Sequence, residues 1–424
     1  MSPPSAYGQL PAGIPGCPIP FTLSVPEAAI TSVNTLVSQA LIDRPTYYNG
    51  ARANPATATF GLSRSWLESV QSEWITNYSW TAAEAYLNSF PNFQINVTTT
   101  SPENQQDFNL HFAALFSKNE SALPVILMHG WPGSWFEFAG VLDLLAAKYT
   151  PETLPYHFVV PSIPDYGLST RTGELKDDAD GGVELTMEGA SEALNELMKE
   201  LGFTKYVAEG GDVGSFLAQT MCWEYDECRA FHLNMLFLSA DQIEEAAALT
   251  NLTVTEEEQA HLKYADEWGT TGKAYASEHA TRPSTISLVV NTNPLAMLAW
   301  IGEKLIEWSD YRVSPSIEKI ITHASFYWYT GSFGRSMWAY RSLFKSVGGP
   351  LPPPVISLTK PFGYSNFPDE LAALPQSWAE YYFPNLVYYN KHTLGGHFAA
   401  MEEPEAFLGD LEEFLAIVGP GVLA

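Results

Sequence analysis

Two patterns of apolar and polar residues alternate along most of the chain. Stretches with helical spacing, such as Thr186 to Leu201, lie between short apolar runs. Runs of this kind are typical of buried strands, and they occur near 107–116, 124–128, 157–161, 205–208, 231–236, 354–359 and 385–389. Since strands that alternate with helices form parallel sheets, the pattern predicts an α/β fold, with a mainly parallel sheet covered by helices on both faces.

The pattern changes near the N-terminus and in the third quarter of the chain. Residues 1–100 contain two helical patterns, at 32–37 and 66–70, and are expected to form an N-terminal segment that wraps the core. Between residues 239 and 346 the strand-like runs stop, and helical segments that carry Trp and Tyr take their place. We therefore expect a core in two parts, residues 101–238 and 347–424, with residues 239–346 inserted as a helical lid.

A glycine-rich turn presents a carboxylate between a predicted strand and a predicted helix. The sequence GGDVGS at 210–215 follows the apolar run at 205–208, and a helical pattern begins at Phe216. Glycines two positions before and after a central residue are typical of the nucleophile elbow of α/β-hydrolases, where a serine normally stands in place of Asp212. An aspartate before a helix is also a common N-cap, so this motif alone leaves both roles open.

An aspartate nucleophile restricts the reactions that the site can catalyse. A carboxylate is already ionised at pH 7 and displaces leaving groups from saturated carbon, which produces an alkyl ester. Attack on an ester or amide carbonyl would give a mixed anhydride, which is an unfavourable product. Esterase, lipase and protease activities are therefore disfavoured.

Two further segments supply groups that such a site needs. The sequence HGWPGS at 129–134 follows the apolar run at 124–128, and loops of this kind provide one oxyanion amide, while the residue after the nucleophile provides the other. Here these amides belong to Trp131 and Val213. Far downstream, His397 follows the last predicted strand, which fits the chain order of nucleophile, acid and histidine in α/β-hydrolases.

From about Pro20 to the C-terminus, the chain resembles the microsomal-type epoxide hydrolases, and most closely the fungal soluble epoxide hydrolases. The resemblance implies an α/β-hydrolase fold and a cofactor-independent enzyme that converts epoxides to vicinal diols. The matching segments are TFGL at 59–62, HGWPGSWFEF at 129–138, PSIPDYG at 161–167, GGDVGS at 210–215, TRPSTISL at 281–288, PLAMLAWIGEKLIEW at 294–308, PFGYSNFPDEL at 361–371 and GGHFAAMEEPE at 395–405.

The resemblance also implies roles for individual residues. Asp212 matches the nucleophile, His397 the base that activates water, and Glu370 the acid that orients the histidine, with the adjacent Asp369 as the alternative acid. Two tyrosines of the lid, Tyr275 and Tyr340, match the donors to the epoxide oxygen. A phenol suits this role because it stays neutral at pH 7 and donates a hydrogen bond to the developing alkoxide.

The chain departs from the family pattern at two positions. Val213 replaces the more frequent tryptophan, although only its backbone N–H is needed, and Asp165 replaces a glycine in what we expect to be a surface turn. Haloalkane dehalogenases share the aspartate nucleophile but generally use an indole at the position of Val213 to hold the halide. A dehalogenase acting on haloalkanes or haloacids remains one alternative function. A biosynthetic enzyme that opens one dedicated epoxide is another, and the sequence leaves detoxification and biosynthesis equally open.

Composition limits the partners. The chain has 424 residues with 21 basic and 48 acidic side chains, so the net charge of −27 disfavours nucleic acid and anionic membrane surfaces. No apolar stretch reaches the roughly 18 residues of a membrane span, and residues 1–20 lack a signal pattern. We therefore expect a soluble, cytoplasmic protein whose partners are a small epoxide and water. The sequence leaves a homodimer open.

The remaining polar residues show no metal or disulfide framework. The nine histidines are scattered, without the spacing of a zinc motif, so no metal or other cofactor is expected. The cysteines, Cys17, Cys222 and Cys228, form an odd and sparse set. This predicts three reduced thiols.

Overall fold

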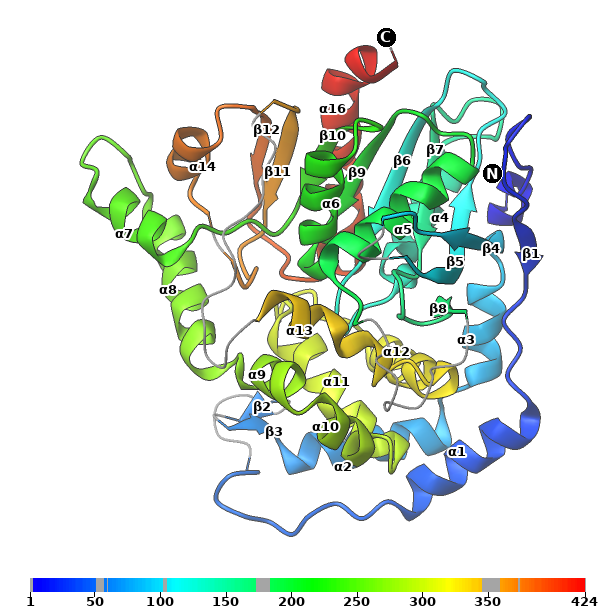
Figure 1. Cartoon of the computed structure of the whole chain (residues 1–424). Coiled ribbons are helices and arrows are strands. Elements are labelled where there is room, and N and C mark those ends of the chain that lie inside the picture. Colours follow the sequence, from blue (N-terminus) through cyan, green and yellow to red (C-terminus); the bar gives the residue numbers. More distant parts are fainter. Residues whose placement is uncertain are drawn as a thin grey trace.

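A computed structural model describes residues 3–50, 57–58, 60–101, 105–172, 184–344, 359–372 and 374–423. Ten strands form one sheet in the order β1-β4-β5-β7-β6-β9-β10-β11-β12, with β8 paired to β5 (Figure 1). The strands are β1 (Ile19–Phe21), β4 (Asn92–Thr98), β5 (Asp107–Leu115), β6 (Leu123–Met128), β7 (Tyr156–Pro161), β8 (Thr170–Arg171), β9 (Tyr206–Gly210), β10 (Cys228–Leu233), β11 (Phe362–Asn366) and β12 (Leu386–Lys391).

The sheet is mainly parallel, as predicted. The strands from β7 through β6, β9, β10 and β11 to β12 are parallel, whereas β1, β4, β5 and β8 form an antiparallel edge. The N-terminal segment therefore contributes β1 and β4 to the sheet itself, which the sequence pattern did not predict. The strand expected at 354–359 lies outside the described residues except for Thr359, and β11 begins at Phe362.

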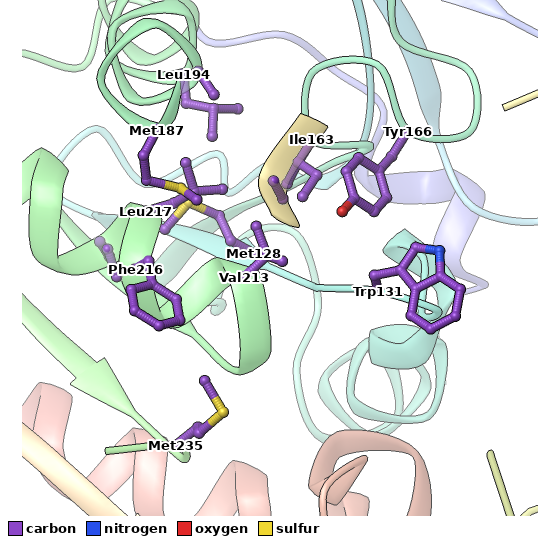
Figure 2. Packing of buried hydrophobic residues seen from close by; sticks show 14 of the residues in the cluster. Met128, Trp131, Ile163, Tyr166, Met187, Leu194, Val213, Phe216, Leu217 and Met235 are labelled. Atoms are coloured by element: carbon purple, nitrogen blue, oxygen red, sulfur yellow. The ribbon is translucent and has the colours of Figure 1, made fainter. Parts of the chain in front are cut away.

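Helices cover both faces of the sheet because its central strands are apolar on both sides. In β6, Ile126 and Met128 belong to the apolar cluster that contains residues of α5 (Met187–Glu200) and α6 (Asp212–Glu224). Val125 and Leu127 belong to the cluster that contains residues of α4 (Ala139–Lys148) and α16 (Pro404–Leu423). Figure 2 shows Met128 beside Val213 and Leu217 of α6.

The described residues between β10 and β11 form helices and contain no strand. Several of these helices begin at a Ser or Thr N-cap, such as Ser239, Thr255 and Ser316. The domain boundaries drawn from the sequence remain a prediction. The helices are α7 (Ala240–Ala248), α8 (Glu256–Thr271), α9 (Ala274–Thr281), α10 (Pro283–Val290), α11 (Pro294–Glu307), α12 (Ile317–Thr330) and α13 (Trp338–Leu343), with the short 3-10 helix η4 (Arg335–Met337).

The N-terminal helices support this helical region as well as the core. Figure 1 shows α1 (Glu27–Gln39) and α2 (Arg64–Thr76) beneath it, on the side away from the sheet, with α3 (Trp80–Leu87) nearby. A separate apolar cluster joins α1 and α2 to α11 and α12. Its buried members are Val33, Val37, Val70, Trp74, Leu295, Leu298, Ile321 and Ala324.

Among the described residues, no single helix is both long and apolar enough to cross a membrane. The two consecutive helices α10 and α11 reach that length and apolarity together, but they are bent by 117° at the break between them.

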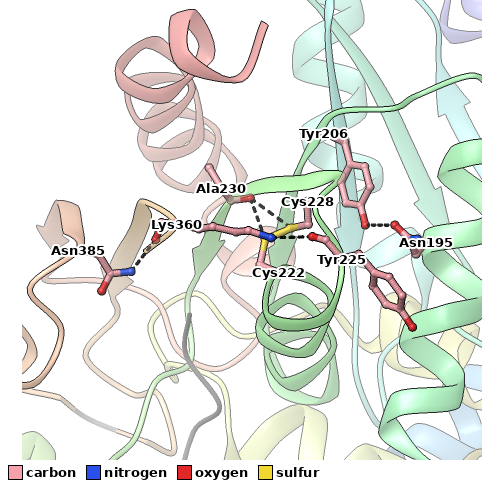
Figure 3. The surroundings of a disulfide bond; sticks show 8 residues. All are labelled: Asn195, Tyr206, Cys222, Tyr225, Cys228, Ala230, Lys360 and Asn385. Atoms are coloured by element: carbon pink, nitrogen blue, oxygen red, sulfur yellow. Dashed lines mark hydrogen bonds between the residues drawn. A yellow bond between two sulfur atoms is a disulfide. The ribbon is translucent and has the colours of Figure 1, made fainter. Parts of the chain in front are cut away.

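The expectation of three reduced thiols is wrong. Cys222, near the end of α6, and Cys228, at the start of β10, form a disulfide with a Cα–Cα distance of 4.8 Å (Figure 3). The chain reverses direction over the five residues between them, so the two buried side chains meet. Counting cysteines could not reveal this pair, because the proximity depends on how the helix returns to the sheet. Cys17 is free and exposed.

We predict that thiol labelling of the denatured, unreduced protein modifies only Cys17, and that three cysteines react after reduction. Because the disulfide closes a short loop, its loss in the double variant Cys222→Ala/Cys228→Ala should lower the free energy of unfolding by about 2 kcal/mol. Mass spectrometry after alkylation and urea unfolding measure these outcomes. Three reactive thiols without reductant would contradict the assignment.

Candidate active site

The turn after β9 holds Asp212 in a backbone conformation that is unusual for a residue with a side chain. Its φ is 47°, in the left-handed region. A Cβ at Gly210 would lie 2.1 Å from the carbonyl oxygen of Gly214, and a Cβ at Gly214 would lie 2.0 Å from that of Met128, so both positions require glycine. Gly211 occupies the N-cap of α6, so the alternative hypothesis that Asp212 is the N-cap is wrong.

The Asp212 carboxylate lies between an amide and an imidazole. Its Oδ1 accepts a hydrogen bond from the backbone N–H of Trp131 at 2.7 Å, and its Oδ2 lies 3.3 Å from Nε2 of His397. Val213 follows in the first turn of α6 with a buried side chain. The loops after β6 and β12 thus reach the same carboxylate.

His397 is paired on its other side with Glu370. The distance from Nδ1 to the Oε1 of Glu370 is 2.7 Å, and the same oxygen accepts a hydrogen bond from the N–H of Leu371, also at 2.7 Å. The neighbouring Asp369 forms a backbone bridge to Gly396 instead. Of the two acids that the sequence offered, the structure therefore brings Glu370 to the histidine.

The two carboxylates control the charge of the histidine. Burial lowers the pKa of His397, but the carboxylates of Glu370 and Asp212 outweigh it and raise this pKa well above its ordinary value. Burial raises the pKa of Glu370, and the imidazole of His397 opposes that shift. His397 also donates its backbone N–H to the carbonyl of Trp308, a residue at the end of α11.

Two tyrosines face Asp212 from the helical region. Tyr275 lies in α9 and Tyr340 in α13, and the hydroxyl of Tyr340 donates to that of Tyr275 at 3.3 Å. The ring of Tyr275 stacks on the indole of Trp131 with centroids 5.2 Å apart. Burial raises the pKa of both phenols well above the ordinary value, and the Asp212 carboxylate adds to the shift. Both are therefore neutral proton donors.

A cavity of about 620 Å³ connects these groups. Asp212, Tyr275 and Tyr340 line it, so the carboxylate and both phenols face one space. Most of the remaining wall is apolar and comes from α6, the segment after β10, α8, and the regions of α13 and α14 (Gln376–Tyr382). The apolar part of the wall includes Val213, Phe216, Met235, Phe237, Leu238, Leu262, Trp268, Leu343, Phe344, Leu371, Leu374 and Trp378.

A second, much smaller cavity lies beside Asp212 and His397. Its volume of about 20 Å³ is enough for one water molecule, and Glu137 and Asn234 also line it. Nε2 of His397 is buried, and the group near it is Oδ2 of Asp212, at 3.3 Å. Burial raises the pKa of Glu137 to about 8, so this carboxyl group carries a proton at neutral pH. Glu137 was not among the expected site residues, although it lies within the HGWPGSWFEF motif.

The expectation of a surface turn at Asp165 is wrong. The residue is 1% exposed and has a φ of 65°, in the left-handed region that favours the glycine of related sequences. Its carboxylate lies 2.7 Å from Nε of Arg171 and 4.0 Å from Nη1 of Arg335 in η4. Arg335 also donates to the carbonyls of Gly167 and Ser169. The loop after β7 therefore anchors the segment that leads to Tyr340, a contact that only the folded chain reveals.

Within the described ranges, no group of three or more His, Cys, Asp or Glu side chains is arranged to hold a metal ion. The polar groups at the site are carboxylates, an imidazole, phenols and amides. Such a set suits nucleophilic and acid–base chemistry on an organic substrate.

The sheet, the elbow and the surrounding helices define an α/β-hydrolase. Residues 124–305 match the alpha/beta hydrolase fold family, and residues 18–138 match the family described as epoxide hydrolase N terminus. A Dothistroma septosporum protein assigned to the epoxide hydrolases is 38% identical over 412 residues, which cover 97% of this chain and 93% of that protein. The chain belongs to the epoxide hydrolase family.

Solved structures and more distant relatives agree with this assignment. The structure of Aspergillus niger epoxide hydrolase is similar with a TM-score of 0.83 and 36% identity, covering 97% of this chain and 99% of that one. Epoxide hydrolase 1 of Oryctolagus cuniculus is 25% identical over 391 residues, which cover 85% of this chain and 81% of the rabbit protein. The expected family, fold and enzyme class are thus confirmed.

We predict that Glu370→Gln lowers the pKa of His397, because it removes the larger of the two charges that raise it. Asp369→Asn is the matched control and should leave this pKa unchanged, since Asp369 is not among the groups that shift it. An NMR pH titration of the imidazole nitrogens measures both. A larger decrease in Asp369→Asn than in Glu370→Gln would reassign the acid.

Proposed function

We propose that this epoxide hydrolase acts in two chemical steps through an ester on Asp212. The observation that carries the proposal is the position of the Asp212 carboxylate. It faces the large cavity and both phenols on one side, and it contacts the Trp131 amide and the His397–Glu370 pair on the other. A nucleophile, a proton donor and a base are therefore grouped around one reacting carbon.

In the first step, the carboxylate of Asp212 attacks a ring carbon of the epoxide. The new ester C–O bond forms as the ring C–O bond breaks, and the electron pair of the broken bond remains on the epoxide oxygen. Tyr275 or Tyr340 gives its phenolic proton to that oxygen, which would otherwise leave as an unfavourable alkoxide. The first step ends with an alkyl ester, one hydroxyl group of the diol and a phenolate.

Formation of the ester removes the negative charge of Asp212, which is one of the two charges that raise the pKa of His397. The imidazolium then becomes more acidic and returns a proton to the phenolate. This transfer leaves His397 neutral at the stage when a base is needed. The electrostatic environment thus couples the two steps without any movement of the histidine.

In the second step, neutral His397 takes a proton from a water molecule in the small cavity. The resulting hydroxide attacks the ester carbonyl, and the amides of Trp131 and Val213 stabilise the oxyanion. As this intermediate collapses, the imidazolium of His397 gives its proton to the leaving oxygen and the diol is released. His397 then takes the proton of the new Asp212 carboxyl group, which restores ionised Asp212 beside protonated His397. Glu137, which is protonated at neutral pH, is placed to hold the water molecule.

The large apolar cavity favours a bulky, lipophilic epoxide, because its volume of about 620 Å³ exceeds the needs of a small alkyl epoxide. The net charge of −27 supports action on a free substrate and not on nucleic acid or an anionic membrane. We still predict that the protein is soluble and cytoplasmic, and a homodimer is still open. The Cys222–Cys228 disulfide weighs against the cytoplasm, since such bonds persist mainly in oxidising compartments.

We predict that a single turnover in ¹⁸O-labelled water gives an unlabelled diol and labelled Asp212, because the first oxygen transferred is that of the carboxylate. In His397→Gln the ester should form but persist, as a substrate-sized added mass on the peptide that contains Asp212. Mass spectrometry measures both results, and Asp212→Ala is the control that forms no adduct. Solvent label in the first-turnover diol would rule out the ester route.

We predict that Tyr275→Phe and Tyr340→Phe each slow ester formation by roughly ten- to a hundredfold, because each removes one hydrogen bond to the epoxide oxygen. The double variant should be nearly inactive, since one phenol partly replaces the other. Stopped-flow measurement of ester formation tests this, with His397→Gln as the background in which the ester accumulates. Full activity of the double variant would show that these tyrosines are not the donors.

A further inference from the structure

Lys304 is a buried cation next to one of the two tyrosines. It lies in α11, its residue surface is 3% exposed, and its ammonium pairs with the carboxylate of Glu303. Nζ also lies 5.2 Å from the ring centroid of Tyr275 and 4.8 Å from that of Trp300. Burial of a lysine is costly even when a carboxylate is paired with it, so its position calls for a physical explanation.

Burial raises the pKa of Tyr275, and the carboxylate of Asp212, which approaches from α6, raises it further, whereas the hydrogen bond from Tyr340 lowers it. Tyr166 and Tyr340 are neutral phenols with raised pKa values. His279, in the same helix as Tyr275, is also neutral because burial lowers its pKa to about 3. The ammonium of Lys304, partly balanced by Glu303, lies over this ring, whereas Lys273 lines the large cavity.

Resting on the proposed two-step function, we propose that Lys304 is a positioning residue that promotes ring opening through Tyr275. As the Asp212–carbon bond forms and the ring C–O bond breaks, the Tyr275 proton moves to the epoxide oxygen and negative charge develops on the phenol. The ammonium stabilises this charge in a region from which water is largely excluded. It also attracts the aromatic ring directly, which fixes the orientation of the phenol.

The geometry assigns Lys304 an effect on the rate of ring opening and not on substrate binding. The residue does not line the 620 Å³ cavity, so it cannot contact the substrate there. A change at Lys304 should therefore alter the rate constant for ester formation while the dissociation constant of the substrate stays the same. A residue with a purely structural role would disturb the packing of Tyr275 and Trp300, and so weaken binding as well.

The test measures ester formation by stopped flow in four single variants of the full chain and in one double variant. Lys304→Met removes the charge but keeps the length of the side chain, and should slow ester formation by roughly tenfold or more. Lys304→Arg keeps the charge and should recover most of the rate. Lys263→Met is the matched control, because it removes one lysine charge from an exposed position in α8, where Lys263 pairs with Glu267. It should match the wild type.

Substrate binding and rescue by a conservative variant separate the electrostatic role from a structural one. Lys304→Met should lower the rate constant for ester formation without weakening substrate binding, and Lys304→Arg should restore the rate. If Lys304→Met fails to fold, as judged by circular dichroism, Lys304→Gln replaces it, because the amide retains a polar contact with Glu303. Weaker substrate binding that accounts for the lost rate, or no rescue by Lys304→Arg, would overturn the proposal.

A double-mutant cycle shows whether Lys304 acts through Tyr275. In the Tyr275→Phe background, Lys304→Met should cause no further loss, since there is no phenol to stabilise. An equal loss in both backgrounds would refute this inference while leaving the two-step mechanism intact. If instead Tyr275→Phe alone retained the wild-type rate, the assignment of Tyr275 in the proposed function would fail first. The two failures are therefore distinguishable.

Discussion

At the end of β9 the backbone passes so close to itself and to β6 that neither Gly210 nor Gly214 has room for a Cβ atom. This constraint places Asp212 in the left-handed region and directs its carboxylate to the amide of Trp131. β6 and β9 are parallel neighbours with Met128 opposite Gly210, so the amide and the carboxylate come from adjacent strand ends. The same edge of the sheet receives the loops that carry Glu370 and His397, and the whole site is thus built around this turn.

Burial decides which of the ionisable groups near this turn carry charge. It raises the pKa values of Glu137 and Glu402 to about 8, so both acids are neutral near pH 7. The charges that the proposed reaction uses are those of Asp212 and the His397–Glu370 pair. Because His397 and Glu370 are buried, the loss of the Asp212 charge beside them changes the acidity of the imidazole strongly. A chemical step at Asp212 can therefore control the next step at His397.

The helical region over the site depends on segments that are distant in sequence. The N-terminal helices α1 and α2 pack on α11 and α12, and so support the helix that carries Lys304. The loop after β7 holds Arg335 through Asp165 and the carbonyls of Gly167 and Ser169, shortly before Tyr340. The positions of both tyrosines relative to Asp212 thus rest on contacts made by the first hundred residues and by the core.

The sequence by itself determined the mainly parallel sheet and the strand–turn–helix at Asp212, because both follow from local patterns of apolar residues and glycines. Family motifs then pointed to Glu370 as the acid. Only the tertiary structure decided that β1 and β4 join the sheet, that Cys222 meets Cys228, and that Asp165 and Lys304 are buried. In a sequence, a charged residue in a loop or helix looks solvent-exposed. Its actual surroundings are set by residues tens to hundreds of positions away, and no local sequence pattern predicts them.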